Sequence, residues 1–183
     1  SYAKKVAETL STTVTAVTVN AGDVSELSNY GVDKVLKVTN DQLATFSAKA
    51  YADVIKQAAQ KEGSKVVILS STTDSIYLSS LVAVGLEAGF ASNVVGLPVS
   101  TAPFQVKRTA FSNKAFNTTE INTEVKVLGI AKNSYGIFEN ASSLTEEDFN
   151  PTIDANDFGV KVTAVEKSSG KISIADADIV VSA

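Results

Sequence analysis

The sequence predicts an α/β protein with three α/β/α layers, a mostly parallel sheet and an added β-hairpin. Strand-like and helix-like segments alternate up to about residue 98, which is typical of βαβ units with right-handed crossovers. An unbroken apolar run at residues 65–70 is typical of a strand buried on both faces of a parallel sheet. After Pro98 the pattern changes to strand propensity without a helical stripe, which predicts a hairpin outside the βαβ part.

The chain is expected to begin within a helix. Apolar side chains at residues 3, 6, 7 and 10 recur with the spacing of one helix face. The next expected elements are a strand at 13–19, a turn at 20–23, a short helix that ends at Gly31 and a strand at 34–39.

Two further helices are predicted on either side of the apolar strand at 65–70. Asn40 is the expected cap of the first, which runs to Lys61 and ends at Gly63. Its apolar stripe is expected to contain Phe46, Ala50, Val54 and Ala58. The second, at 76–90, is apolar nearly all round and is therefore expected to pack on two sides.

The second half of the chain has β character. A hairpin is expected around Ser112 and Asn113, followed by a buried strand at 125–132. Residues 133–158 are polar and predict a surface connection, in which the acidic run at 146–148 favours the start of a helix. Further strands are expected at 160–167 and 177–183. The predicted organisation is a core at 1–132 and, at 133–183, a connecting segment with terminal strands.

Composition excludes several kinds of site. The 183 residues contain neither histidine nor cysteine, which removes Ser-His-Asp and Cys-His catalysis and the commonest zinc ligands, and no metal site is expected. The formal charge of −4 argues against a nucleic-acid partner. No apolar run is long enough to cross a bilayer and no leader opens the chain, so we expect no membrane insertion and a cytoplasmic protein.

One stretch raises the question of a ligand site. The apolar run VVILS leads directly into hydroxyl side chains at Ser71, Thr72, Thr73 and Ser75. The carboxyl end of a parallel strand beside a helix N-terminus is where open α/β sheets bind anions and nucleotides. However, the stretch has no glycine or lysine, and the Asp74 carboxylate would repel phosphate. Ser and Thr are also preferred helix caps, so capping is favoured and an anion site is the alternative.

Several segments resemble one known family in order along nearly the whole chain. The segments are GVDKVLKV, the stretch from KVVILSSTTDS to ASNVVGL, VKVTAVEKSSGK and ADADIVVSA, and they are similar to the amino-terminal domain of the electron transfer flavoprotein alpha subunit. The resemblance implies a nucleotide-binding-like fold of the adenine nucleotide alpha hydrolase type. In that family a further strand precedes the position of Ser1, and an FAD-binding domain follows the position of Ala183.

The resemblance also implies a function. The family pairs an alpha with a beta subunit, holds FAD mainly in the carboxyl-terminal domain of alpha, and carries electrons from flavoprotein dehydrogenases, such as acyl-CoA dehydrogenases, to a quinone-linked acceptor. The chain is therefore expected to be an electron-carrier domain and not an enzyme, with FAD in the full-length protein and none on this fragment. Ser182 and Ala183 are expected to lie at the edge of the FAD motif. A nucleotide-binding module using the loop at 71–75 is the alternative.

Overall fold

The computed structural model describes residues 1–160, 162–164, 166, 177 and 179–181. Its helices and strands follow one another in the order α1 (Tyr2–Leu10), β1 (Thr15–Val19), η1 (Ser25–Tyr30), β2 (Lys34–Val38), η2 (Asp41–Ala44), α2 (Ala48–Glu62), β3 (Val66–Ser70), α3 (Thr73–Gly85), β4 (Gly89–Val94), β5 (Ser100–Thr101), β6 (Phe104–Ala110), β7 (Ala115–Glu120), β8 (Lys126–Ile130), β9 (Thr145–Asp148) and η3 (Ala155–Phe158).

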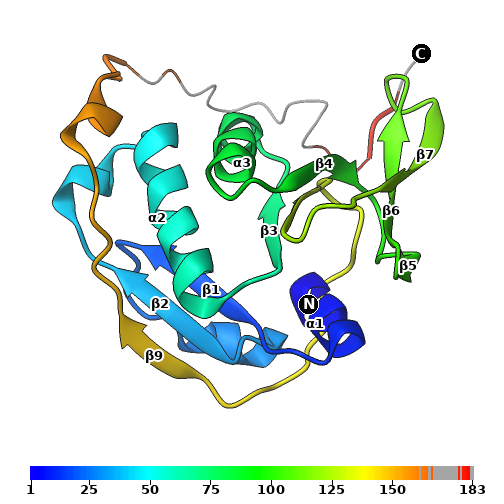
Figure 1. Ribbon diagram of the computed structural model, residues 1–183, viewed down its shortest axis with the longest axis horizontal. Coiled ribbons are helices and arrows are strands. Elements are labelled where there is room, and N and C mark those ends of the chain that lie inside the picture. Colours follow the sequence, from blue (N-terminus) through cyan, green and yellow to red (C-terminus); the bar gives the residue numbers. More distant parts are fainter. Residues whose placement is uncertain (161, 165, 167–176, 178, 182–183) are drawn as a thin grey trace.

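The strands form two sheets. The first has the order β1-β2-β9 and is entirely parallel. The second has the order β3-β8-β4-β6-β5, with β3, β8 and β4 parallel and β5, β6 and β7 antiparallel. The α/β class and the mostly parallel pairing are therefore as predicted, and the β6–β7 hairpin lies at the end of the molecule opposite β9 (Figure 1).

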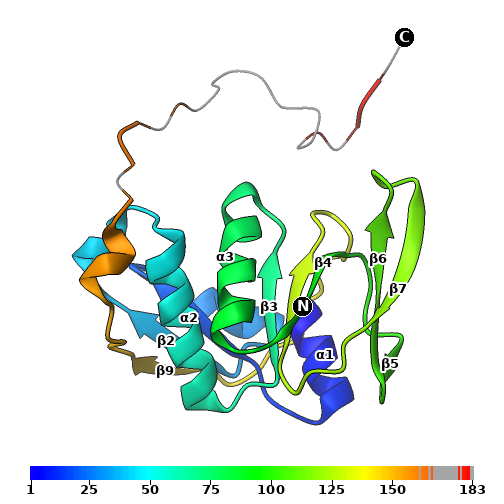
Figure 2. The same ribbon diagram turned by 45° about the horizontal axis from the view of Figure 1, so that its top comes forward.

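Strand β8 shows how the three layers are built. Its neighbouring residues Val127 and Leu128 are both fully buried but face opposite sides of the sheet. Val127 packs with Leu78 and Val82 of α3, whereas Leu128 packs in the cluster that contains Val6 of α1. Figure 2 shows α2 and α3 side by side on one face of the sheets. Because side chains alternate along a strand, both faces of β8 are covered by helices.

Strand β3 is less buried than expected. Its four apolar side chains, from Val66 to Leu69, are all half-buried, although each face contacts a helical cluster. The reason is its position at the edge of the second sheet, where β8 is its one strand partner in the described part of the chain. Strand β1 is likewise an edge of the first sheet, and of the strands that the structure describes it pairs with β2 alone.

The predicted long helix is shorter than expected. Asn40 does act as a cap, because its side chain accepts a hydrogen bond from Gln42 N, but the element it caps is η2. Helix α2 begins separately at Ala48, after an extended residue at Ser47. From there the predicted stripe is correct, since Ala50 and Val54 are fully buried.

Helix α3 packs on one side and not two. Leu78, Val82 and Ala83 are buried, but Tyr77 and Val84 are 73% and 79% exposed. The helix also ends at Gly85, and β4 begins at Gly89. The prediction extended the helix to residue 90 because the apolar residues continue without a break in composition.

The acidic run at 146–148 forms a strand and not a helix start. It is part of β9, in which Leu36 of β2 stands opposite Glu147 in parallel register. Glu147 accepts from Lys34 at 2.7 Å and from Lys61 at 2.8 Å. These hydrogen bonds lower the pKa of Glu147 to about 2. The carboxylates are therefore neutralised by lysines from distant segments, which a local sequence pattern does not reveal.

The polar segment after residue 132 contributes to the fold through β9 and through Phe149, Ile153 and Phe158, which pack against the cluster around Val54. The division of the chain at residue 132 stays a prediction. The strands expected at 160–167 and 177–183 are not found, since residues 160, 162–164, 166, 177 and 179–181 are not in a strand. The other positions of these two segments, including Ser182 and Ala183, lie outside the described residues.

Candidate functional site

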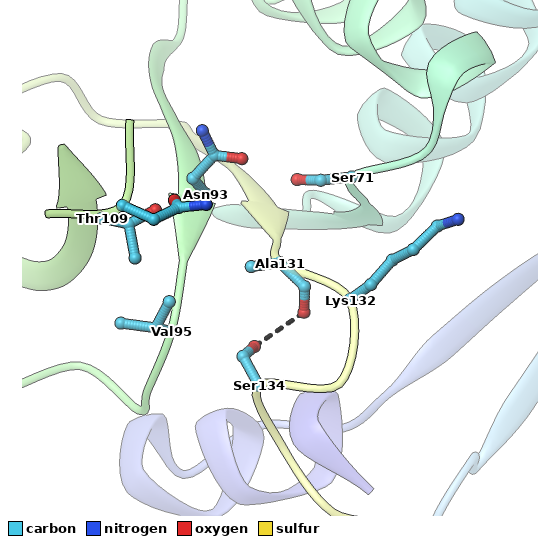
Figure 3. Close-up of a pocket in the computed structure, with 8 residues that line it drawn as sticks. Ser71, Asn93, Val95, Thr109, Ala131, Lys132 and Ser134 are labelled. Atoms are coloured by element: carbon cyan, nitrogen blue, oxygen red, sulfur yellow. Dashed lines mark hydrogen bonds between the residues drawn. The ribbon is translucent and has the colours of Figure 1, made fainter. Parts of the chain in front are cut away.

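A polar cavity lies where the parallel strands of the second sheet end. It has a volume of about 350 Å³ and is lined by Ser71, Asn93, Val95, Thr109, Asn113, Ala131, Lys132 and Ser134. Ser71 directly follows β3, Ala131 directly follows β8, and Asn93 is the second-last residue of β4 (Figure 3). Ligands of open α/β sheets bind at this edge, outside the carboxyl ends of the strands. The cavity is therefore the candidate functional site.

The hydroxyl-rich loop reaches this cavity through one residue. The backbone N–H of Ser71 donates to the Ile130 carbonyl at 2.7 Å and so extends the β3–β8 pairing. Gly129 of β8 gives the Ser71 side chain room, because a Cβ at Gly129 would lie 3.1 Å from Ser71 Oγ. The Ser71 hydroxyl is thus held at the carboxyl edge of the sheet.

The next hydroxyls cap α3. Thr72 is the N-cap, and its backbone N–H donates to Ser75 Oγ at 2.7 Å. Ser75 N–H donates in return to Thr72 Oγ1 at 3.3 Å, which completes a capping box. The buried Ser75 hydroxyl also donates to the Ser70 carbonyl. Thr73 and Asp74 are exposed. The predicted cap is confirmed, and the hydroxyls of Thr72 and Ser75 are both engaged in its hydrogen bonds.

Asn93 reaches the cavity because β4 bulges. The register of β4 against β8 shifts between Ala91 and Val94, and Asn93 adopts a left-handed conformation with φ of 54°. Asparagine tolerates this conformation better than most residues, and bulges commonly redirect a side chain near a site. Figure 3 shows the Asn93 amide directed toward the Ser71 hydroxyl.

The loop after β8 closes the lower side of the cavity. Ala131 N–H donates to the Val94 carbonyl at 2.9 Å, and Ser134 Oγ donates to the Ala131 carbonyl at 2.7 Å. These bonds fix the loop to β4. Lys132 brings the one formal charge among the eight lining residues.

The lining favours binding over catalysis. Hydroxyl, amide and ammonium groups are donors that suit a small oxyanion. The eight lining residues include neither a carboxylate nor an imidazole or thiol that could transfer a proton near neutral pH. Among the residues that the structure describes, no group of three or more His, Cys, Asp or Glu side chains is placed to hold a metal ion.

A flavin does not fit this cavity. Cofactor sites for large planar rings are lined mainly by apolar and aromatic side chains, whereas the lining here contains no aromatic ring and only Val95 and Ala131 as apolar residues. The lining also has no glycine-rich turn for a pyrophosphate. The described residues therefore offer no flavin site at this edge of the sheet.

Of the loop residues 71, 72, 73 and 75, the structure places only Ser71 in the cavity lining. Sequence reasoning missed its other lining residues. Lys132 could have been found, because it is the last residue of the predicted strand at 125–132 and so lies at the same sheet edge. Asn93 and Asn113 could not, since their positions depend on the bulge and on the hairpin turn.

No described helix is both long and apolar enough to span a bilayer, and the longest, α2, has 15 residues.

Residues 1–155 match the model of a family described as "Electron transfer flavoprotein domain". The chain is also similar to a curated protein of Bacillus subtilis (strain 168) named "Electron transfer flavoprotein subunit alpha". The two are 26% identical over 158 residues, which cover 85% of this chain and 48% of the relative. The chain thus spans about half the length of the curated relative it matches.

Proposed function

The chain belongs to the electron transfer flavoprotein family, and from this premise we propose that it is the amino-terminal domain of an alpha subunit that works in an alpha/beta electron carrier. The observation that carries the proposal is the family match over residues 1–155, together with the similarity to a protein named as the alpha subunit. The three-layer fold with its mostly parallel sheet agrees with it.

In this role the domain provides structure and contact surface. The redox chemistry belongs to FAD, which accepts and returns electrons when bound. Because the described cavity does not suit a flavin, we propose that FAD is held by another part of the full-length protein. The donors we propose are flavoprotein dehydrogenases such as acyl-CoA dehydrogenases, and the acceptor is linked to quinone. The mild acidity and the lack of cysteine support a cytoplasmic location.

An absorption spectrum of the full-length gene product, co-expressed with a beta-type subunit of the same organism, tests the proposal. We expect a flavin spectrum and two subunits in equal amounts by intact mass. The control is a chain of residues 1–183 alone, which we expect to be colourless. A colourless two-chain complex, or a full-length protein that does not bind the beta-type subunit, would contradict the proposed function.

The cavity supports a second candidate function, the binding of a nucleotide phosphate or another small oxyanion. The observation in its favour is that the polar groups of Ser71 and Asn93 face each other in a cavity at the carboxyl edge of the sheet, which Lys132 also lines. Calorimetric titration with AMP and with inorganic phosphate tests it. Lys132→Gln should weaken binding at least about tenfold, while Lys49→Gln, an exposed lysine on α2, should leave it unchanged. Absence of heat with both ligands would remove this candidate.

A further inference from the structure

The hairpin arm, residues 104–120, exposes its turn and nearly all of its outer strand. Its inner strand β6 is anchored, since Phe104 and Val106 are buried in the core. Among the described residues its outer strand β7 pairs with β6 only, and Thr119 is the one residue of β7 that is not exposed. Both views show the arm at the margin of the molecule (Figures 1 and 2). The arm thus presents a free strand edge of six residues.

The arm carries a charge opposite to that of the rest of the chain. The arm contains Lys107, Arg108 and Lys114 and one carboxylate, Glu120 at its end, so its formal charge is +2. The formal charge of the whole chain is −4, so the remainder has −6, since −4 less +2 is −6. A local positive patch on an acidic protein attracts an acidic surface and fixes its orientation.

Two aromatic rings accompany these charges. Phe111 at the turn is 84% exposed and Phe116 on β7 is 63% exposed. Lys107 Nζ lies 4.1 Å from the centre of the Phe116 ring. The register explains the contact, because Phe116 stands opposite Thr109, and Lys107 is the diagonal neighbour on the same face. Exposed aromatic rings beside cations have the composition of a protein interface core.

The turn holds Phe111 outward in an unfavourable backbone conformation. Phe111, Ser112 and Asn113 have φ angles of 56°, 50° and 63°, and Lys114 N–H donates to the Phe111 carbonyl at 3.1 Å. A left-handed conformation is uncommon for a bulky residue, and residues held in such conformations concentrate at ligand clamps and functional sites.

We propose that the hairpin arm is the docking element for the partner subunit, and that it binds an acidic surface with an apolar recess for Phe111 and Phe116. The inference rests on the proposed function, because that function supplies the partner. The free edge of β7 can add main-chain hydrogen bonds to the contact. Single-stranded nucleic acid also binds cations and aromatic rings, but a charge of −6 on the rest of the chain repels phosphates and favours the protein partner.

The exposed apolar face of α3 provides a matched comparison. Ile76, Tyr77 and Val84 are 60%, 73% and 79% exposed, and thus comparable in exposure to the aromatic rings of the arm. Helix α3 has no basic side chain, so it lacks the charge that selects an acidic partner.

The test compares variants of the full-length alpha chain for binding to the beta-type subunit by sedimentation equilibrium and stopped-flow association. The double variant F111S/F116S should weaken the complex at least about tenfold. The variant K107E/K114E should lower the association rate and reduce its dependence on salt. The control I76S/V84S should bind within about twofold of wild type. Thermal unfolding should be similar for all variants, since the substituted side chains are exposed.

Each other outcome overturns the inference. If wild type binds the subunit and both arm variants bind equally well, the arm is not the docking element and the proposed function stands. If I76S/V84S is the one variant that loses binding to the beta-type subunit, docking is through α3. If wild type does not bind the subunit, the proposed function fails together with the inference. Binding of a labelled oligothymidylate that is lost in K107E/K114E, without any effect on the subunit, would assign the arm to nucleic acid.

Discussion

At the scale of single residues, Ser75 connects the end of β3 to the start of α3. Its buried hydroxyl accepts from Thr72 N–H and donates to the Ser70 carbonyl, so one side chain satisfies a helix donor and a strand acceptor. A serine therefore has a structural task in a stretch whose composition also suggests a ligand loop.

Replacing Ser75 tests this task. Ser75→Ala should lower the free energy of unfolding by about 1 to 2 kcal/mol, because it removes one half of the capping box and the hydrogen bond from the buried hydroxyl to the Ser70 carbonyl. Ser80→Ala is the control, since that exposed hydroxyl bonds only to the Ile76 carbonyl within its own helix. Urea denaturation measures both, and equal losses would contradict the capping role.

Glu147 makes stability depend on pH. Its folded-state pKa of about 2 lies below the ordinary value of 4.5, because Lys34 and Lys61 hydrogen-bond to its carboxylate. A lowered pKa gives stability that is present above the unfolded value and is lost as pH falls through the folded value. The contribution of Glu147 should therefore fade between about pH 4.5 and about pH 2.

The variant Glu147→Gln isolates this effect. At pH 6 its urea midpoint should lie below that of wild type, and the difference should shrink as the pH approaches about 2. A difference that stays constant from pH 6 to pH 2 would assign the effect of the substitution to packing.

At the scale of elements, each of the two sheets has an edge strand that is paired on one side only. Strands β1 and β3 each have one neighbour in the part of the chain that the structure describes, whereas β8 lies between β3 and β4. An unpaired edge leaves alternate backbone N–H groups without a strand partner.

Hydrogen exchange at single-amide resolution distinguishes these strands. Alternate amides of β1 and β3 should exchange markedly faster than the amides of β8, which bond on both sides. Uniformly slow exchange across β1 and β3 would show that a further segment pairs with these edges.

At the scale of the whole molecule, the three layers meet at β8. Leu128 is fully buried between the sheet and α1. Leu128→Ala should lower the free energy of unfolding by about 3 kcal/mol, since it leaves a cavity between two layers. Ile137→Ala, at a residue that is 82% exposed, should change it by less than about 0.5 kcal/mol. Similar losses for both would show that the layers do not share this core.

The sequence by itself determined the elements whose signals are local. The apolar spacing of α1, the glycine stops at Gly31 and Gly63, and the hairpin around Ser112 all follow from preferences of neighbouring residues. The family resemblance was also readable, because it depends on segments in order along the chain.

Only the tertiary structure decided the features that depend on distant partners. The run at 146–148 becomes a strand because Lys34 and Lys61 neutralise Glu147 across more than eighty residues of chain. Asn93 and Lys132 form one cavity because β4 and β8 are adjacent in space and a bulge redirects one of them. The exposed face of α3 was also unpredictable, since composition gives the hydrophobicity of a helix but not which elements will cover it. Local backbone preferences act between near neighbours, whereas burial and charge pairing are settled only when the chain brings remote segments together.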